Sequence, residues 1–221
     1  MLTALFAVTV GSACGSGSTH GAEAPAHEHG HHGFTDAAAW SKVFDDPARD
    51  AWQRPDDVLR ALELSPAMSV ADVGAGTGYF SVRLARALPS GKVIATDIEP
   101  DMVRYLNERA AREQLPNLHA VPATQADSGL TPESVDRVLI VHVWHHLADR
   151  VAYARDLAAA LRPGGRVLVV DFSLTASHGP PPNMRLAPEA IVADLTAAGL
   201  MARLSPVALP DQYIVEARRA P

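Results

Sequence analysis

Three glycines at alternate positions follow a short apolar segment and could hold a ligand against the main chain. The segment covers residues 70–73, and the glycines are Gly74, Gly76 and Gly78. Glycine is needed where the backbone takes a positive φ, or where a ligand approaches with no Cβ in between. Asp72 stands two residues before the first glycine. A carboxylate at that place favours a ligand that carries an ammonium and a sulfonium group, and it would repel a pyrophosphate.

A second carboxylate and a pair of histidines lie at the ends of later apolar segments. Asp97 closes residues 92–97, where its oxygens can accept hydrogen bonds from ribose hydroxyls. His145 and His146 follow residues 135–141. A histidine at such a place can act as a general base, because its ordinary pKa is near neutrality. The alternative is that one histidine packs against the following helix and another lines the pocket.

Alternating strands and helices must position these side chains. Phe80, Leu84 and Leu88 recur at i, i+4 and i+8, which gives the helix after the glycines an apolar stripe. From residue 68 onward, strands and helices alternate at the spacing of βαβ units, which predicts a mostly parallel sheet with helices on both faces. The strands are expected at residues 70–73, 92–97, 118–122, 135–141 and 166–172, the helices at 100–114, 149–161 and 188–198, and a terminal antiparallel hairpin at 200–205 and 212–217.

The pattern Asp-x-Gly-x-Gly-x-Gly, with Asp97 at the end of the next strand, resembles the class I S-adenosylmethionine-dependent methyltransferases. A dinucleotide-binding dehydrogenase would place Gly or Ala where Tyr79 stands. The run Leu-Arg-Pro-Gly-Gly-Arg, followed by an apolar strand that contains Asp171, is a further feature of the family. The resemblance spans roughly residues 49–172. It implies an α/β fold with a Rossmann-like seven-stranded sheet, helices on both faces and a C-terminal antiparallel hairpin.

The resemblance also implies the cofactor and its site. The cofactor would be S-adenosylmethionine, and the reaction would transfer its methyl group to a small-molecule acceptor by in-line displacement. The residues expected to bind the cofactor are Asp72, Gly74, Ala75, Gly76, Gly78, Tyr79, Asp97, Ile98, Asp127 and His142. Thr124 or Gln125 could take the place of Asp127 near adenine, and Met102 could join Ile98 on the adenine face or only pack its helix. The candidate catalytic residues are His145 and His146.

Composition excludes several other classes of protein. A net charge of −6 and a pI near 5.9 argue against a general nucleic-acid binder, which would present a basic face. Cys14 is the single cysteine, so neither an internal disulfide nor a multi-thiol site can form. A metal site at His145 and His146 is disfavoured, because adjacent helical residues face different ways and no third ligand is evident. No oligomeric state is predicted.

The N-terminal part of the sequence differs in character from the rest. Residues 1–14 are similar to a bacterial lipoprotein signal that ends at Cys14, although no Lys or Arg lies in the first ten residues and Gly11 stands where Leu is usual. Residues 15–33 are a low-complexity linker that should be disordered, and they contain five histidines that could bind metal weakly or only lengthen a tether. Two locations therefore stay open: a lipid-anchored protein in the periplasm or on the cell surface, and a cytoplasmic one.

Residues 34–66 are predicted to form a helical lid, and residues 67–221 the methyltransferase domain. Arg49, Trp52 and Gln53 are candidates for contact with substrate or cofactor, with a packed helix as the alternative. The loop at 175–182 could close over an acceptor, and the pocket could include Arg185, Gln212 and Tyr213. A second hypothesis is an exported, lipid-tethered binding protein that keeps the fold without turnover.

Overall fold

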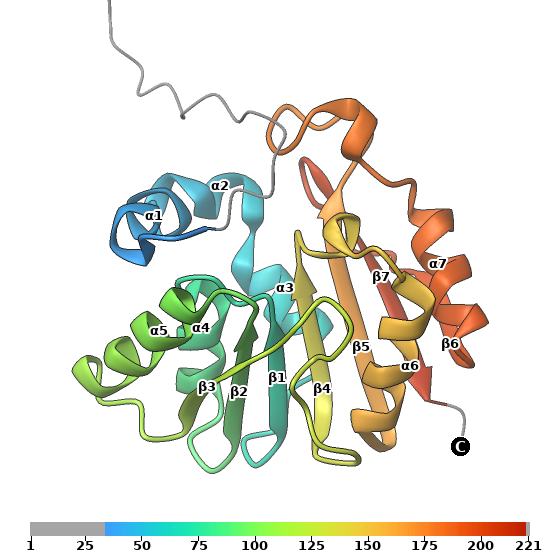
Figure 1. Ribbon diagram of the computed structural model, residues 1–221. Coiled ribbons are helices and arrows are strands. Elements are labelled where there is room, and N and C mark those ends of the chain that lie inside the picture. Colours follow the sequence, from blue (N-terminus) through green and yellow to red (C-terminus); the bar gives the residue numbers. More distant parts are fainter. Residues whose placement is uncertain (1–33, 220–221) are drawn as a thin grey trace, which may run out of the picture. The chain divides into compact units, whose positions relative to one another are not determined.

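The computed structural model describes residues 34–219, and these contain a seven-stranded sheet in the order β3-β2-β1-β4-β5-β7-β6 (Figure 1). The expected signal at 1–14, Cys14 and the linker at 15–33 lie outside the described residues. The strands are β1 (Ser69–Val73), β2 (Lys92–Asp97), β3 (Leu118–Pro122), β4 (Val135–Val141), β5 (Leu161–Phe172), β6 (Leu200–Leu204) and β7 (Gln212–Arg219). Among the described residues, no helix is long and apolar enough to cross a bilayer.

Strands β1 to β5 run parallel, and β7 is antiparallel to both of its neighbours, β5 and β6. This arrangement confirms the predicted fold class and its C-terminal hairpin. Strand β1 has β2 as its neighbour on one side and β4 on the other, so the strand order reverses at β1. Such a reversal of strand order opens a crevice at the carboxyl ends of the strands, where ligands bind in open α/β sheets. The carboxyl ends of β1 and β4 are therefore the expected place for a site.

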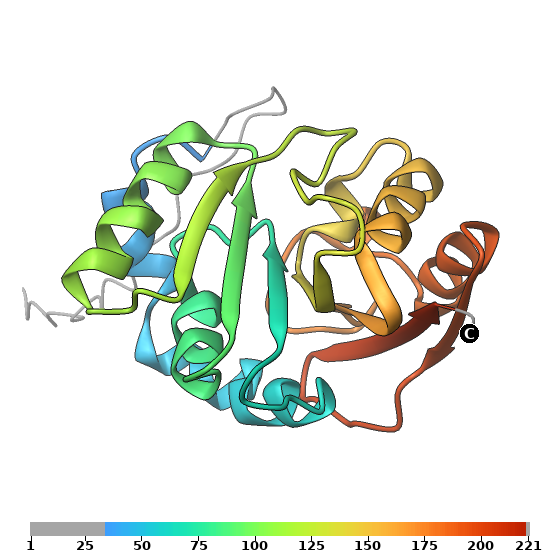
Figure 2. The same ribbon diagram turned by 90° about the horizontal axis from the view of Figure 1, so that it is seen from below.

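Helices cover both faces of the sheet, as the strand–helix alternation predicts (Figure 2). One apolar core joins the sheet to α3 (Pro55–Ala61), α4 (Tyr79–Ala87) and α5 (Pro100–Arg112). The other core joins it to α6 (Arg150–Ala160) and α7 (Pro188–Ala197). The apolar stripe of α4 is buried as predicted, because Phe80, Leu84 and Leu88 are each at most 3% exposed.

Strand β5 begins five residues earlier than its sequence predicts. The sequence predicts a helix to residue 161 and a strand only from residue 166, but Leu161 already pairs with Val135 of β4. The pairing then shifts register between Val135 and Arg137. Residues 162–165 have no partner in the register, and Gly164 takes φ 74 there, so this stretch bulges between the paired Leu161 and Arg166. The apolar pattern of the sequence marks only the regular part of the strand, in which residues 167–172 are all buried.

The N-terminal segment consists of short helices that pack onto the sheet domain. It contains α1 (Ala37–Phe44), a 3-10 turn η1 (Pro47–Arg49) and α2 (Asp50–Gln53), followed by α3. Asp36 caps α1 by accepting the amide of Ala39, as Asn, Asp and Ser commonly do. The Asp101 carboxylate at the start of α5 accepts the amide of Ala37 at 2.7 Å. Arg109 of α5 forms an ion pair with Asp45 at 2.9 Å, so α5 holds both ends of α1.

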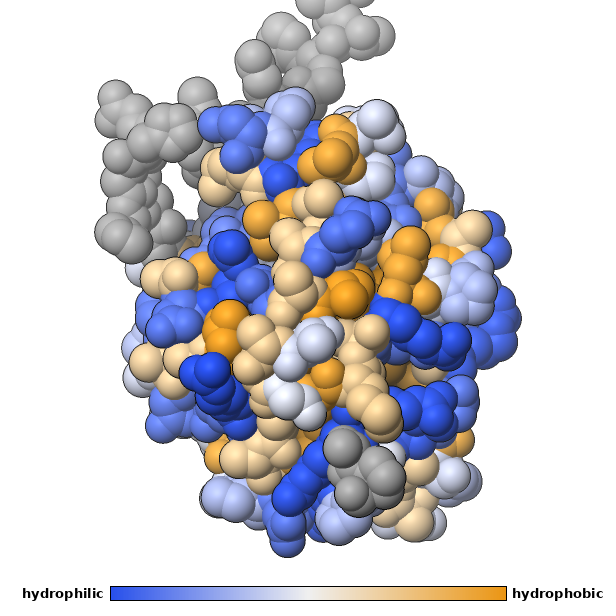
Figure 3. All heavy atoms as spheres, turned by 90° about the vertical axis from the view of Figure 1, so that its right-hand side faces the viewer, coloured by the Kyte–Doolittle hydropathy of each residue, from blue (hydrophilic) through white to orange (hydrophobic). Residues whose placement is uncertain are grey.

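Strand β6 forms one edge of the sheet and lies on the face drawn in Figure 3. Met201 and Leu204 on this strand leave about half of their surface exposed, at 55% and 50%. Hydrophobic and hydrophilic residues are interspersed over this face. Arg203, between the two exposed apolar side chains, forms an ion pair with Glu216 of β7. A charged side chain on an edge strand disfavours pairing with further strands.

Candidate active site

The glycine turn joins the carboxyl ends of β1, β2 and β4. The amides of Gly74 and Ala75 both donate to the carbonyl of Thr96 in β2, at 2.8 and 3.0 Å. Gly74 takes φ 67, and a Cβ at this position would lie 2.3 Å from Cγ2 of Val143, just after β4. Gly76 takes φ 55, and its Cβ would touch the ring of Phe44. Glycine is thus required in this turn by the positive φ values and, at Gly74, by the close packing of Val143.

Asp97 lies beside this turn at the end of β2. Its Oδ2 accepts the amide of Gly76 at 2.8 Å, and its Oδ1 accepts the amide of Glu99 at 3.0 Å. The residue is 8% exposed, and this burial raises the pKa of its carboxyl above the ordinary value. Each carboxylate oxygen can accept more than one hydrogen bond. Asp97 is therefore fixed in place with capacity left for a pair of hydroxyl groups.

Asp72 lies below the turn, on β1, and is almost fully buried. The hydroxyl of Ser81 donates to its Oδ2 at 2.5 Å. Burial raises the pKa of Asp72 to about 6, and the nearby negative charge of Asp97 acts in the same direction. The positive charge of Arg49 opposes this shift. A carboxyl with this pKa changes charge within the physiological range.

Arg49 supplies a positive charge next to the turn. Its guanidinium lies over the ring of Tyr79, 4.1 Å from the centroid, and donates to the carbonyl of Phe44 at 2.8 Å. Burial lowers the pKa of Arg49 to about 10, so the side chain stays cationic at neutral pH. The turn is thus flanked by a carboxylate at Asp72 and a cation at Arg49. Bare glycine backbone, two carboxylates and one cation fit a nucleoside that bears both an ammonium and a carboxylate group, as S-adenosylmethionine does.

The remaining residues of the predicted cofactor site occupy different settings. Ile98 is 48% exposed after β2, whereas Met102 is 1% exposed and packs within α5, the alternative considered for it. Asp127 is exposed, and its Oδ1 accepts the amide of Gly129 at 2.8 Å within a local turn. Ala75 lies within the turn, and Tyr79 begins α4. Ala75 and Tyr79 therefore lie in or next to the glycine turn beside Asp97, whereas the carboxylate of Asp127 is engaged in a separate local turn.

The histidines after β4 have three different environments. His142 takes φ 60, a left-handed conformation that is uncommon outside glycine, and its ring stacks on Phe172 at 3.9 Å. His145 points its Nδ1 at both carboxylate oxygens of Asp171, at 2.9 and 3.1 Å. His146 is exposed next to it. Among residues 34–219, no group of three or more His, Cys, Asp or Glu is arranged to hold a metal ion.

Four flat side chains gather above the ends of β4 and β5. Trp52 stacks on His178 at 4.9 Å and lies 6.0 Å from both His142 and Phe172. His178 is held in turn by the carboxylate of Asp211. Trp52 therefore lies among these rings rather than in either helix–sheet core. These rings come from the N-terminal segment, two strand ends and the loop after β5.

Sequence reasoning found the histidines but missed their partners. Asp171 was noted only as part of β5, although strand order places it beside the segment after β4. Phe172 was taken only as the last residue of that strand. Of the proposed pocket residues, Gln212 is buried near His142, and the hydroxyl of Tyr213 donates to the carbonyl of Leu186 at 2.8 Å. Arg185 instead holds the loop after β5 together, because its guanidinium donates to backbone carbonyls of that loop.

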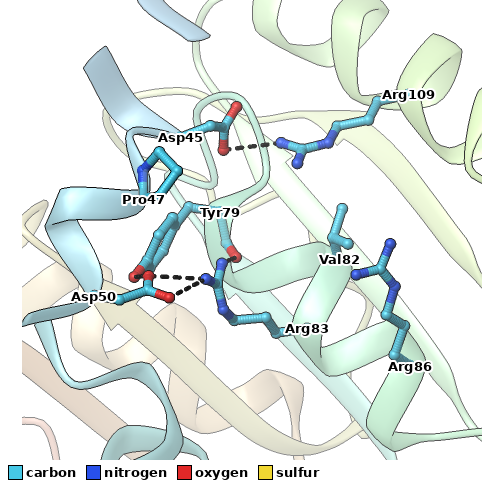
Figure 4. Close-up of a pocket in the computed structure, with 8 residues that line it drawn as sticks. All are labelled: Asp45, Pro47, Asp50, Tyr79, Val82, Arg83, Arg86 and Arg109. Atoms are coloured by element: carbon cyan, nitrogen blue, oxygen red, sulfur yellow. Dashed lines mark hydrogen bonds and ion pairs between the residues drawn. The ribbon is translucent and has the colours of Figure 1, made fainter. Parts of the chain in front are cut away.

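A shallow pocket of about 280 Å³ lies between the N-terminal segment and α4 (Figure 4). It is lined by Asp45, Pro47, Asp50, Tyr79, Val82, Arg83, Arg86 and Arg109. Its cations are paired: Arg83 with Asp50, Arg86 with Glu113, and Arg109 with Asp45. Neither Asp72 nor Asp97 lines it. The pocket therefore borders the glycine turn through Tyr79 but is separate from the carboxylates expected to bind a nucleoside.

Comparison with known proteins agrees with this geometry. Residues 70–165 match a family model described as a methyltransferase domain. An uncharacterized methyltransferase of Mycobacterium tuberculosis is 36% identical over 117 residues, which are 52% of this chain and 44% of that protein. A ubiquinone/menaquinone biosynthesis C-methyltransferase of Pasteurella multocida is 35% identical over 111 residues, covering 47% of this chain and 40% of that protein. The chain thus spans less than half the length of the curated relatives it matches.

A solved structure supports the same assignment over a larger part of the chain. The S-adenosylmethionine-dependent methyltransferase of Aquifex aeolicus superposes with a TM-score of 0.75 at 25% identity. The match covers 84% of this chain and 99% of that one. The strand order, the glycine turn with Asp97 and these matches agree. Residues 70–165 therefore form a domain that matches the methyltransferase family model, and the chain is similar over most of its length to an S-adenosylmethionine-dependent methyltransferase.

Proposed function

We propose that the protein transfers a methyl group from S-adenosylmethionine to a small-molecule acceptor. The observation that carries the proposal is the fixed carboxylate of Asp97 beside the bare glycine turn. When bound, S-adenosylmethionine supplies a methyl group on a positively charged sulfur, which a nucleophile can displace in line. The residues of the chain must then bind the cofactor, orient it toward the acceptor and remove one proton from the acceptor.

Binding and orientation would be shared among three charged residues. Asp97 would accept the ribose hydroxyls with the lone pairs that its backbone partners leave free. Asp72 would face the ammonium group and Arg49 the carboxylate of the methionine part, because they are the opposite charges that flank the turn. Fixing both ends of a reactant in this way can remove much of the entropic barrier of a displacement reaction.

Proton removal would fall to His145. A carboxylate at Asp171 accepts hydrogen bonds, so Nδ1 of His145 would donate to it, which would leave Nε2 as the ring nitrogen able to take a proton. A histidine oriented by a buried carboxylate is a common arrangement for a general base. Both side chains are almost fully buried, at 3% and 1% exposure, which keeps the pair in one geometry.

Calorimetry of the full chain with S-adenosylmethionine tests the cofactor assignment. Asp97→Ala should weaken binding by roughly 1–3 kcal/mol, since it removes a charged hydrogen-bond acceptor. Glu108→Ala is the matched control, because Glu108 is an exposed carboxylate on the surface of α5. Equal affinity in both variants would contradict the role of Asp97.

Mass spectrometry of S-adenosylhomocysteine release over a panel of small phenols, amines, thiols and carbon acids tests turnover. Release that depends on one class of acceptor is the expected result. Binding of the cofactor with no release for any acceptor would instead favour the binding protein considered above. Absence of cofactor binding would contradict both.

A further inference from the structure

A buried run of polar side chains links the N-terminal segment to the end of β4. Arg49 donates to Oε1 of Gln53 from Nε at 3.2 Å and from Nη2 at 3.0 Å. Nε2 of Gln53 donates to Oε1 of Gln212 at 2.9 Å. Nε2 of Gln212 then contacts Nε2 of His142. Gln53 is 0% exposed and Gln212 is 5% exposed, so water does not compete for these amides.

The chemistry of Arg49 sets the direction of every hydrogen bond in this run. A guanidinium only donates, so Gln53 must turn its carbonyl oxygen toward Arg49 and its amide nitrogen toward Gln212. Gln212 must then offer its oxygen to Gln53 and its nitrogen to His142. An amide nitrogen also only donates, so Nε2 of His142 must accept. A neutral imidazole with an accepting Nε2 carries its hydrogen on Nδ1.

We propose that Arg49, through Gln53 and Gln212, holds His142 as a neutral imidazole with its hydrogen on Nδ1. His142 then offers the acceptor a hydrogen-bond donor and cannot take its proton. The tautomer of His142 follows from these contacts alone. The further statement that Nδ1–H donates to the methyl acceptor rests on the proposed function. Gln53 and Gln212 are positioning residues in this account, because they act through His142, and Arg49 has this role in addition to the binding role proposed above.

The surroundings of His142 support this state. Its ring is held on Phe172 at 3.9 Å, and its backbone takes φ 60, so the imidazole has a fixed place. Burial lowers the pKa of His142 well below 6.5, and the positive charge of Arg49 and the neighbouring His145 and His146 act in the same direction. A second proton on this ring is therefore unfavourable at neutral pH.

The two histidines of the site would then divide the work. His145 has its Nδ1–H engaged by Asp171 and keeps a lone pair at Nε2. His142 has its Nε2 engaged by Gln212 and keeps a hydrogen at Nδ1. One ring can take a proton, and the other can donate a hydrogen bond. The site would thus suit an acceptor that carries an oxygen or nitrogen lone pair next to the atom that is methylated.

Nitrogen-15 NMR of the histidine-labelled full chain, without cofactor, reads the tautomer directly. The signals of His142 are identified by their loss in His142→Phe. A protonated Nδ1 and an unprotonated Nε2 are expected. An unprotonated Nδ1 with a protonated Nε2, or a doubly protonated ring at neutral pH, would overturn the proposal in the unaltered protein.

Gln53→Glu tests the relay from a residue that does not touch His142. A carboxylate at position 53 can accept from Arg49 but cannot donate to Gln212. The Gln212 amide should therefore turn round, present its oxygen to His142 and move the ring hydrogen from Nδ1 to Nε2. Arg49→Lys is the matched control: it keeps a donor-only cation, so the tautomer should stay on Nδ1.

An unchanged tautomer in Gln53→Glu, or an inverted one in Arg49→Lys, would overturn the proposal. If Gln53→Glu does not fold, Gln212→Glu makes the same prediction, since a carboxylate next to His142 requires a hydrogen on Nε2. None of these NMR measurements requires the protein to methylate an acceptor. A protein that fails to methylate any acceptor but shows these tautomers would contradict the proposed function alone.

Discussion

Nδ1 of His145 lies 2.9 Å from Oδ1 of Asp171, and the two side chains are only 3% and 1% exposed. One residue follows β4 and the other lies near the end of β5, two strands that pair in parallel. Burying a carboxylate is costly unless it is paired, so the pair is either a structural contact or an oriented base. Activity measurements separate these alternatives.

His145→Gln should lower kcat by about 10²–10⁴-fold while cofactor affinity is retained, because only proton transfer is removed. His146→Gln is the control: it makes the same change at the exposed neighbour and should have a much smaller effect. Steady-state kinetics and calorimetry measure the two quantities. Unchanged turnover in the His145 variant would leave the pair with a structural role only.

Cofactor affinity should depend on pH through Asp72. Burial raises the pKa of this carboxyl to about 6, so it is mostly neutral below that pH. An ammonium group prefers the ionised carboxylate, and binding below pH 6 must first release the proton. Affinity measured by calorimetry should therefore fall by about tenfold for each pH unit below 6. Asp72→Asn should bind weakly without this slope, and an unaltered protein with a flat profile would refute the contact.

The same carboxyl should weaken the folded state at neutral pH. The folded-state pKa of about 6 lies above the ordinary value of 3.8, so stability falls as pH rises from about 4 through 6. Asp72→Asn, which can still accept the hydroxyl of Ser81, should raise the free energy of unfolding by roughly 1–3 kcal/mol at pH 8. At pH 4 it should have little effect. Urea denaturation at both pH values checks this, and a destabilised variant at pH 8 would argue against the direction of the shift.

The close approach of Gly74 to Val143 predicts a large effect of one methyl group. Gly74→Ala combines an unfavourable φ of 67 with a Cβ placed 2.3 Å from Cγ2 of Val143. It should reduce the free energy of unfolding by roughly 2–4 kcal/mol. Gly164→Ala is the matched control, since Gly164 has φ 74 but no atom within 4 Å of its Cβ position, and it should show only the backbone cost of about 1–2 kcal/mol.

A double-mutant cycle isolates the contact between the two strand ends. Val143→Ala in the background of Gly74→Ala should recover stability relative to the sum of the single changes, with a coupling of about 0.5–3 kcal/mol. Additive energies would show that the ends of β1 and β4 are farther apart than the structure has them.

Local sequence patterns were sufficient to predict the strands of the sheet, the glycine turn after β1 and the position of Asp97 at the end of β2. Asp72 and the glycines mark the end of β1, and Asp97 marks the end of β2. Because the two strands are parallel, their carboxyl ends lie at the same edge of the sheet. The start of β5 was missed because Leu161 extends the strand through a register shift, which leaves no periodic signal.

What the sequence by itself determined is the order of strands and helices and the chemistry at each strand end, because both follow from residue types within a few positions. The partners of those residues were decided only by the tertiary structure. Gln53 and Gln212 are 159 positions apart, and they meet because the N-terminal segment contacts the start of β7, which pairs with β5. Contacts over such separations depend on strand order and on how the segments pack. No local pattern of apolar and polar residues records either of these.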